Sequence, residues 1–221
     1  MDRQDTDQLR ELLSAIPDLT GRPATVEDRG RFQRYLDLFM RWNQVHRMTA
    51  LDSPAEIVRG LFLDSLLFLP VLPASRPIKV VDIGAGSGVP GLPMRIVDSG
   101  IALTLVEAKR KRASFLLAVS RELDLPGVRV IEGRAETLVQ EDPMLAEGFD
   151  VVVARAVGPA RDLFPLAMRY LRPGGTVVLA GGPGAAEGPG FEIVKVPAPG
   201  QQRTTRVFLR GVKRSNVPRG T

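Results

Sequence analysis

The chain has 221 residues, of which 44% are hydrophobic, and a formal net charge of +5. These values fit one full domain with a smaller addition, exclude a globally disordered chain, and favour a polyanionic partner. The chain has no cysteine, which excludes a disulfide framework and a thiolate zinc site. It has a single histidine, His46, whereas multi-histidine metal centres need several and a catalytic triad needs one beside its nucleophile. We therefore expect no metal.

The N-terminal segment is polar and lacks the apolar core of a signal peptide. The longest apolar run, from Leu61 to Leu72, contains Asp64 and is too short to span a bilayer. We therefore expect a soluble, cytoplasmic protein, and we expect a monomer.

Residues 1–72 are predicted to form a helical region. Apolar side chains recur on one face of residues 5–16 and predict a short helix, followed by a turn-rich connector from Pro17 to Pro23. Thr25 then begins a longer helix as its N-cap, with Asp28 in the position of a capping box.

The longer helix carries an apolar stripe that we interpret as core or domain-docking surface rather than as a ligand site: Phe32, Tyr35, Leu36, Phe39, Met40 and Trp42. Another helix is expected to begin at Ser53, with Pro54 in its first turn. We expect it to continue toward Leu72 and to end near Pro70 to Pro73.

From Ile78 onward, short apolar strands alternate with helical segments. Strands are predicted at Ile78–Ile83, Ala102–Val106, Val128–Ile131, Asp150–Ala154 and Thr176–Ala180. Helices are predicted at Leu92–Asp98, Arg110–Leu123 and Ala160–Leu171. This alternation is typical of an α/β fold with a doubly wound, mostly parallel sheet, closed by an antiparallel pair at Ile193–Val196 and Thr205–Leu209. Residues 73–212 would form this main domain, and 213–221 a basic tail.

A glycine-dense turn follows the first predicted strand. Gly84, Gly86 and Gly88 let backbone N–H groups approach a ligand without interference from a Cβ atom. Gly86 to Gly91 also satisfies the spacing of the dinucleotide-binding fingerprint, which is a weak signal by itself. The turn is therefore a candidate cofactor-binding element, with Gly84 and Gly86 in contact with the cofactor.

Charged residues follow the next three predicted strands. Glu107 ends the second, at a suitable distance downstream to accept hydrogen bonds from ribose hydroxyls. Arg134-Ala135-Glu136 follows the third strand, and Arg155-Ala156 follows the fourth. Because ligands of open α/β sheets lie at the carboxyl ends of the strands, these residues should converge on the glycine turn. A single charged residue at a strand end is often only a solvated end of that strand. Charged residues after three strands that end at the same edge as the glycine turn favour a nucleoside cofactor site.

Two prolines bear on which nucleoside binds. A pyrophosphate needs free N–H groups at the helix N-terminus, and Pro90 and Pro93 remove two of them. Adenosylmethionine carries no phosphate, so the turn favours a methyl donor over NAD. An NAD-dependent oxidoreductase would also need a hydride-handling pair of residues, and we find none in the sequence.

The run Lys109-Arg110-Lys111-Arg112 opens the helix after Glu107. Cations there oppose the helix macrodipole, and two interpretations stay open: a patch that faces phosphates, or an ordinary solvated face. Further basic residues gather near the C-terminus, where Glu192 is the only acid after residue 190: Arg203, Arg206, Arg210, Lys213, Arg214 and Arg219. Together these cations suit RNA phosphates, with an affinity that falls steeply with salt.

Over nearly its whole length the chain resembles the bacterial 16S ribosomal RNA guanine-N7 methyltransferases, the family of glucose-inhibited division protein B or ribosomal small-subunit methyltransferase G. Residues 82–93 are similar to the first motif of that family, including its Pro-Gly. Further similar segments follow in order: Trp42-Asn43, Met48-Thr49-Ala50, Leu63-Asp64-Ser65-Leu66, Leu105-Val106-Glu107, Lys111-Arg112, Phe115-Leu116, Arg134-Ala135-Glu136, and Phe149-Asp150 through Arg155-Ala156.

This resemblance implies a Rossmann-like class I methyltransferase that uses S-adenosyl-L-methionine to methylate N7 of a guanine in 16S ribosomal RNA or the small ribosomal subunit. It also implies a set of cofactor contacts: Gly84, Val89, Glu107, Ala135, Glu136 and Arg155. Arg134 and Arg155 would lie near the target guanine, as the candidate catalytic residues.

Three positions depart from the family pattern. Leu61 stands where the family usually has histidine, Arg47 where it usually has asparagine, and Gly181-Gly182 where it has Lys-Gly. The missing groups are polar and would face the substrate, whereas the cofactor side is intact. Two alternatives therefore stay open: a methyltransferase with a different acceptor, and a non-catalytic RNA-binding relative.

Overall fold

The computed structural model describes residues 8–155, 158–181, 190–199 and 205–214. Within these residues, seven strands form one sheet in the order β3-β2-β1-β4-β5-β7-β6. They are β1 (Ile78–Ile83), β2 (Ile101–Glu107), β3 (Val128–Glu132), β4 (Phe149–Ala154), β5 (Leu171–Ala180), β6 (Glu192–Pro197) and β7 (Thr205–Val212). β1 to β5 pair in parallel, and β7 is antiparallel to both of its neighbours. The predicted parallel sheet with an antiparallel closing pair is confirmed.

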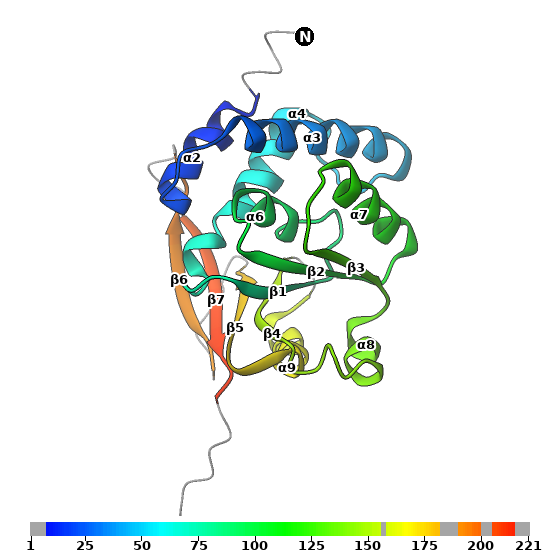
Figure 1. Cartoon of the computed structure of the whole chain (residues 1–221), viewed down its shortest axis with the longest axis vertical. Coiled ribbons are helices and arrows are strands. Elements are labelled where there is room, and N and C mark those ends of the chain that lie inside the picture. Colours follow the sequence, from blue (N-terminus) through cyan, green and yellow to red (C-terminus); the bar gives the residue numbers. More distant parts are fainter. Residues whose placement is uncertain (1–7, 156–157, 182–189, 200–204, 215–221) are drawn as a thin grey trace, which may run out of the picture.

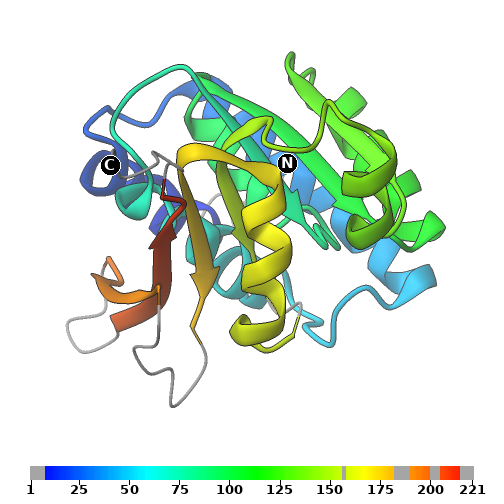
Figure 2. The same ribbon diagram turned by 90° about the horizontal axis from the view of Figure 1, so that it is seen from below.

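The sheet is doubly wound. The chain moves outward from β1 to β3 and then crosses back to place β4 on the other side of β1. Helices α6 (Gly91–Val97) and α7 (Arg110–Glu122) cover one face, and α8 (Ala135–Glu141) and α9 (Ala160–Tyr170) cover the other (Figures 1 and 2). The carboxyl ends of β1 and β4 therefore meet where the strand order reverses, which is where open α/β sheets bind ligands.

One helix, α8, has no counterpart among the predicted elements. It is seven residues long, and the side chain of its N-cap residue, Arg134, makes no capping hydrogen bond. A helix this short, without a capping signal, is hard to recognise from periodicity. Its start is fixed by a tertiary contact instead, because the Tyr170 hydroxyl donates to the carbonyl of Ala135 (2.8 Å).

The N-terminal region is helical, as predicted, but its first helix continues further than expected. α2 (Arg10–Thr20) passes through Pro17 and ends at Gly21, whose φ is 71°. Pro17 removes only one backbone hydrogen bond, and the Thr20 hydroxyl donates to the carbonyl of Ile16 (2.7 Å) one turn earlier. The predicted connector is therefore wrong from Pro17 to Thr20. Residues 5–7 of the predicted helix lie outside the described residues.

The long helix α3 (Val26–His46) begins with the predicted capping box, formed by Thr25 and Asp28. The predicted core role of its apolar stripe is confirmed, because four of its side chains are buried and Met40 and Trp42, partly buried, pack against the same cluster. The ring of Tyr35 stacks on that of Phe62 with centroids 4.5 Å apart and also lies against Phe115 of α7. This aromatic cluster fixes α3 over α6 and α7 (Figure 1).

The helix predicted from Ser53 is present but is broken into segments. A capping box of Ser53 and Glu56 begins α4 (Pro54–Ile57). A π-helix, a short α-helical segment and a 3₁₀ turn follow: η1 (Val58–Leu63), α5 (Asp64–Leu66) and η2 (Leu69–Val71). π-Helical turns are rare and recur at functional sites, which makes η1 a segment of interest.

Two hydrophobic clusters fill the described molecule, one on each face of the sheet. The larger joins the N-terminal helices to α6, α7 and the sheet, and the smaller lies under α8 and α9. The division of the chain at residues 72 and 73 marks the change from helices to strands and stays a prediction as a domain boundary. In the described part of the chain, no helix is long and apolar enough to cross a membrane.

Candidate functional site

A pocket of about 530 Å³ opens at the carboxyl ends of β1 to β4. We call it the edge pocket, and its walls come from the residues that follow each of these strands: Ile83, Gly84, Val106, Ala108, Lys109, Gly133, Arg134, Ala135, Glu136, Gly158, Pro159, Asp162, Leu163 and Leu166. Its volume is within the range of small-molecule sites, and it lies where the fold predicts a ligand.

The glycine turn after β1 is held from two sides. The N–H groups of Gly84 and Ala85 both donate to the carbonyl of Val106 on β2 (2.9 and 3.0 Å). From the other side, the Tyr35 hydroxyl of α3 donates to the carbonyl of Ser87 (2.5 Å). The N-terminal helical region therefore fixes the conformation of this turn directly.

The sequence associates all three glycines of the turn with a ligand, but packing against neighbouring side chains explains why residue 88 is glycine. Gly88 has a φ of 89°, and a Cβ atom there would lie 2.4 Å from Leu92 and 2.7 Å from the Tyr35 hydroxyl. Gly84, with a φ of 69°, instead lines the edge pocket. Of the three glycines of the turn, Gly84 is thus the one that lines the pocket.

Glu107 joins the glycine turn to the start of α7. Its two carboxylate oxygens accept from the N–H groups of Gly86 (2.9 Å) and Lys109 (2.8 Å). Glu107 is only 4% exposed, whereas its neighbours Val106 and Ala108 line the edge pocket. Each carboxylate oxygen has a second lone pair, so ribose hydroxyls could still donate to Glu107.

The N-terminus of α6 has no free donor for a phosphate in the described structure. Gly91 N–H donates to the carboxylate of Asp82 (2.9 Å), Leu92 N–H donates to the carbonyl of Gly88 (2.7 Å), and Pro93 has no N–H. A pyrophosphate at this helix would have to displace bonds that hold the turn together. This arrangement argues against NAD more strongly than the two prolines alone.

Asp82 is a buried acid directly behind the turn. Burial raises its pKa to about 7, and the charge of Glu107 adds to this increase, whereas the Gly91 N–H and the charge of Arg155 oppose it. Its Oδ1 atom has no hydrogen-bond partner among the described residues. Asp82 therefore titrates near neutral pH.

Arg155, at the end of β4, lies in a cluster of three charged side chains. Its guanidinium donates to the carbonyl of Gly60 in η1 (2.7 Å) and lies 3.4 Å from Asp64, whose carboxylate is also 3.2 Å from Arg206 of β7. Burial lowers the pKa of Arg155, and the charge of Asp64 opposes this. The sequence did not predict the contact between Asp64 and Arg155. The position of Asp64 inside an apolar run was nevertheless a signal, because a carboxylate in such a run needs a charged partner.

The predicted site residues fall into three groups. Gly84, Arg134, Ala135 and Glu136 line the edge pocket, with Arg134 3.8 Å from Glu136 in an exposed ion pair. Gly86 and Glu107 are bonded to each other just behind its wall. Val89 packs against the larger hydrophobic cluster, and Arg155 contacts Gly60 and Asp64 rather than Arg134.

Several residues around the edge pocket escaped prediction, notably Tyr35 and the α9 residues Asp162, Leu163 and Leu166. They come from helices whose sequences show only an apolar stripe. The described residues contain no group of three metal-ligating side chains.

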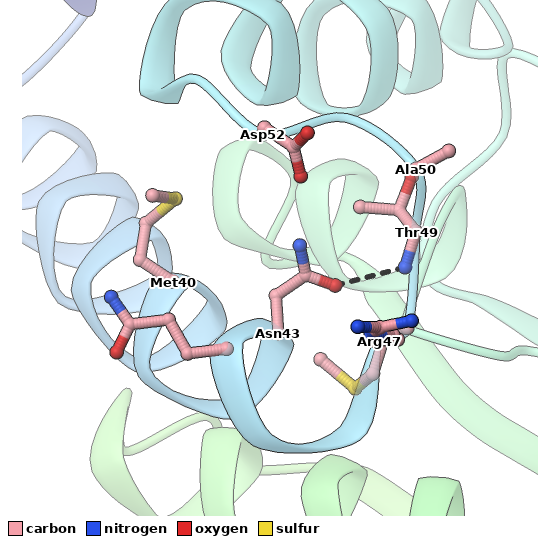
Figure 3. Close-up of a pocket in the computed structure, with 8 residues that line it drawn as sticks. Met40, Asn43, Arg47, Thr49, Ala50 and Asp52 are labelled. Atoms are coloured by element: carbon pink, nitrogen blue, oxygen red, sulfur yellow. Dashed lines mark hydrogen bonds between the residues drawn. The ribbon is translucent and has the colours of Figure 1, made fainter.

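Two further pockets lie beside the C-terminal end of α3. The loop pocket, of about 750 Å³, is lined by Met40, Asn43, Gln44, Arg47, Met48, Thr49, Ala50 and Asp52. Figure 3 shows Asn43 at its centre, where its side-chain oxygen accepts from the N–H of Thr49 (2.9 Å). The basic pocket, of about 340 Å³, is lined by His46, Arg47, Met48 and the run Lys109 to Arg112.

The positions that depart from the family pattern have distinct surroundings. Arg47 ends α3 in the left-handed conformation, with a φ of 46°, which asparagine adopts more readily than arginine does. Leu61 is buried in η1, and Gly181 N–H donates to the carbonyl of Val207 (2.8 Å). The left-handed backbone at residue 47 alone would therefore favour asparagine over arginine. Gly182 lies outside the described residues.

Comparison with known proteins supports the architecture and identifies the family. A solved precorrin-6y C5,15-methyltransferase from Geobacter metallireducens has a TM-score of 0.50 and 16% identity, over 67% of this chain and 87% of that one, which indicates a shared fold. The Rossmann-like class I methyltransferase fold is thus confirmed.

Two curated relatives named "Ribosomal RNA small subunit methyltransferase G" are similar in sequence. The protein from Caldanaerobacter subterraneus subsp. tengcongensis is 41% identical over 65% of this chain and 60% of its own length. The protein from Sorangium cellulosum is 42% identical over 69% of this chain and 64% of its own length. The matched segment thus spans under two thirds of these relatives. Because the family model described as "rRNA small subunit methyltransferase G" matches residues 28–187, the chain belongs to that family.

Proposed function

We propose that this protein transfers a methyl group from S-adenosyl-L-methionine to N7 of a guanine in 16S ribosomal RNA, presented by the RNA or the small ribosomal subunit in the cytoplasm. The proposal rests above all on the edge pocket, which lies at the strand reversal of a chain in the methyltransferase G family. The names of the curated relatives support ribosomal RNA as the acceptor.

The edge pocket suits adenosylmethionine. Its walls combine apolar side chains of Val106, Leu163 and Leu166, which fit an adenine ring, with the backbone of Gly84 and the carboxylate of Glu136. The α6 N–H groups are already bonded, which a cofactor without phosphates tolerates. When bound, adenosylmethionine would supply the electrophilic methyl group.

The protein has little proton chemistry to perform, because guanine N7 already carries an in-plane lone pair. It mainly has to orient the acceptor in line with the methyl donor, and such orientation can lower the activation barrier by roughly 7–11 kcal/mol. Arg155 is the candidate for this positioning, because Gly60 and Asp64 hold its guanidinium while its Nη1 atom has no hydrogen-bond partner among the described residues. A hydrogen bond from this buried Nη1 atom to O6 would hold the guanine in place, so that Arg155 acts by positioning the acceptor and not by removing a proton.

Arg134 would have a different role from Arg155. It lies at the mouth of the edge pocket, exposed and close to Glu136. We assign Arg134 to the acceptor side of this pocket, where it would contact the substrate, and Gly84, Gly86, Val89, Glu107, Ala135 and Glu136 to the cofactor side.

Substitution of Arg155 tests the proposal. Transfer of tritiated methyl groups to small subunits that lack the modification should fall by about 10²-fold in Arg155→Ala, the loss expected when the acceptor is no longer held in line with the methyl donor. Arg155→Lys, which keeps the charge but loses the planar fork, should recover only part of the activity. Adenosylmethionine affinity, measured by calorimetry, should change far less, since Arg155 is not part of the edge pocket.

The fold should survive this change, because Asp64 keeps Arg206 as its partner. Wild-type transfer by Arg155→Ala would contradict the role of Arg155. A wild-type protein that binds adenosylmethionine but transfers no methyl group to ribosomal RNA would favour the non-catalytic relative, and transfer to another acceptor would favour the second alternative.

A further inference from the structure

The basic pocket lies between two segments that are far apart in the sequence. His46, Arg47 and Met48 come from the end of α3, and Lys109 to Arg112 come from the start of α7. It shares Lys109 with the edge pocket, and it shares Arg47 and Met48 with the loop pocket. The basic pocket therefore neighbours both the edge pocket and the loop pocket.

The cations of the basic pocket differ from most arginines elsewhere in having no acidic partner. In the described part of the chain, arginines commonly pair with nearby acids, as Arg59 does with Glu11 and Arg172 with Asp150. Arg47, Lys109, Arg110, Lys111 and Arg112, by contrast, form no side-chain ion pair or hydrogen bond with any described residue. The nearest acid in sequence, Glu107, already uses both of its oxygens to bind backbone N–H groups.

We propose that the basic pocket binds the phosphodiester backbone of a single-stranded RNA segment next to the nucleotide to be methylated. This inference rests on the proposed function, since it names where the same substrate is held. Four cations of the basic pocket are exposed: Arg47, Lys109, Arg110 and Lys111. Lys109 also lines the edge pocket, so we assign the phosphate contacts to the other three. Because they lie on two sides of a concave surface, they fit a strand better than a flat anionic membrane.

An aromatic side chain at the pocket supports RNA over an acidic peptide. His46 is exposed and lines the basic pocket, and its ring lies 5.1 Å from that of Trp42. Proteins that bind single-stranded nucleic acids combine cations for the backbone with aromatic rings on which bases stack. An acidic peptide would use the cations but has no base to place on these rings.

A charge-neutralising variant tests the site. In Arg47→Gln/Arg110→Gln/Lys111→Gln, the affinity for a fluorescent single-stranded oligonucleotide of 16S sequence should fall by roughly 100-fold at 0.1 M salt, about 5-fold for each lost phosphate contact. The slope of log affinity against log salt should become shallower by about 2. Adenosylmethionine binding, measured by calorimetry, should stay at the wild-type level, because none of the three residues lines the edge pocket.

The matched control removes the same charge from other places. Arg29, Lys79 and Lys195 are exposed and make no ion pair within the described residues, and Arg29→Gln/Lys79→Gln/Lys195→Gln should leave the salt slope unchanged because distant charges are screened. Equal losses in both variants would overturn the proposal, as would displacement of the RNA by phosphatidylglycerol vesicles or an oligoglutamate peptide at lower concentrations than by unlabelled RNA.

The two hypotheses fail in different ways. If the wild-type protein methylates ribosomal RNA and the basic-pocket variant binds RNA normally, the basic pocket is not the binding site and the proposed function stands. If the wild-type protein neither binds adenosylmethionine nor transfers a methyl group, the proposed function is wrong whatever the RNA affinity.

Discussion

At the residue scale, the buried carboxyl group of Asp82 connects the glycine turn to the energetics of folding. One of its oxygens accepts from Gly91 N–H, and the other has no partner among the described residues. In the unfolded chain the same group has a pKa near its ordinary value of 3.8, whereas burial raises it to about 7 in the fold. Between these two values the folded state binds a proton that the unfolded state does not, so stability is lost as the pH rises.

Asp82→Asn should remove this dependence, because the amide oxygen can still accept from Gly91 but does not titrate. Between pH 5 and pH 7 the free energy of unfolding of the wild type should fall relative to that of the variant by up to about 3 kcal/mol. Urea unfolding of both proteins at pH 5, 6, 7 and 8 measures the difference. Parallel stability curves would show that Asp82 is ionised throughout this range.

Site residues were predictable where a side chain follows a strand, and unpredictable where it depends on a tertiary partner. Glu107 and Arg155 could be located because parallel strands end at one edge. The contacts of Arg155 with Gly60 and Asp64 could not, because a π-helical turn and the segment after it, far away in the sequence, supply them. The left-handed backbone conformation of Arg47 could not be predicted either, because arginine has no preference for it.

At the scale of elements, α3 acts on the cofactor side through a single hydroxyl group. Tyr35 packs in the aromatic cluster with Phe39 and Phe62, and its hydroxyl reaches the carbonyl of Ser87 in the glycine turn. The predicted stripe on α3 was expected to be core, and this is confirmed, but the polar end of Tyr35 also fixes the turn that lines the edge pocket.

Tyr35→Phe should weaken adenosylmethionine binding by several-fold, because the turn loses its support, and should cost about 1–2 kcal/mol of stability for the unpaired carbonyl. Phe39→Leu is the control, since it disturbs the same cluster without touching the turn. It should lower stability as well but leave adenosylmethionine affinity unchanged. If both variants bind the cofactor equally, Tyr35 has only a packing role.

Secondary structure was predictable in proportion to how local its signals are. The strands and the caps at Thr25 and Ser53 are local, and the structure has them where expected, except that β5 begins at Leu171 and not at Thr176. α8 and the π-helix η1 lack such signals, and α2 continues through Pro17 because its apolar face remains buried. In each of these three cases packing determines the conformation that local preference leaves open.

At the scale of the whole molecule, the helical layer and the sheet act together on one edge. α3 supports the glycine turn, η1 and α5 supply the contacts of Arg155, and the end of α3 forms one wall of the basic pocket. The order of the strands follows from the alternation of strands and helices in the sequence, whereas the placement of the helical layer over α6 and α7 does not. Because these contacts hold the glycine turn and Arg155, removal of the layer should abolish cofactor binding and transfer together.

The sharpest test of the proposed function is to map the methylated product. Small subunits lacking the modification are incubated with the protein and adenosylmethionine, and the 16S RNA is then treated with borohydride and aniline, which cleave the chain at N7-methylguanosine. We expect one new cleavage, at one guanine, that requires the wild-type protein and is lost with Arg155→Ala. Methyl transfer to the RNA without any aniline-sensitive site would contradict the assignment of guanine N7.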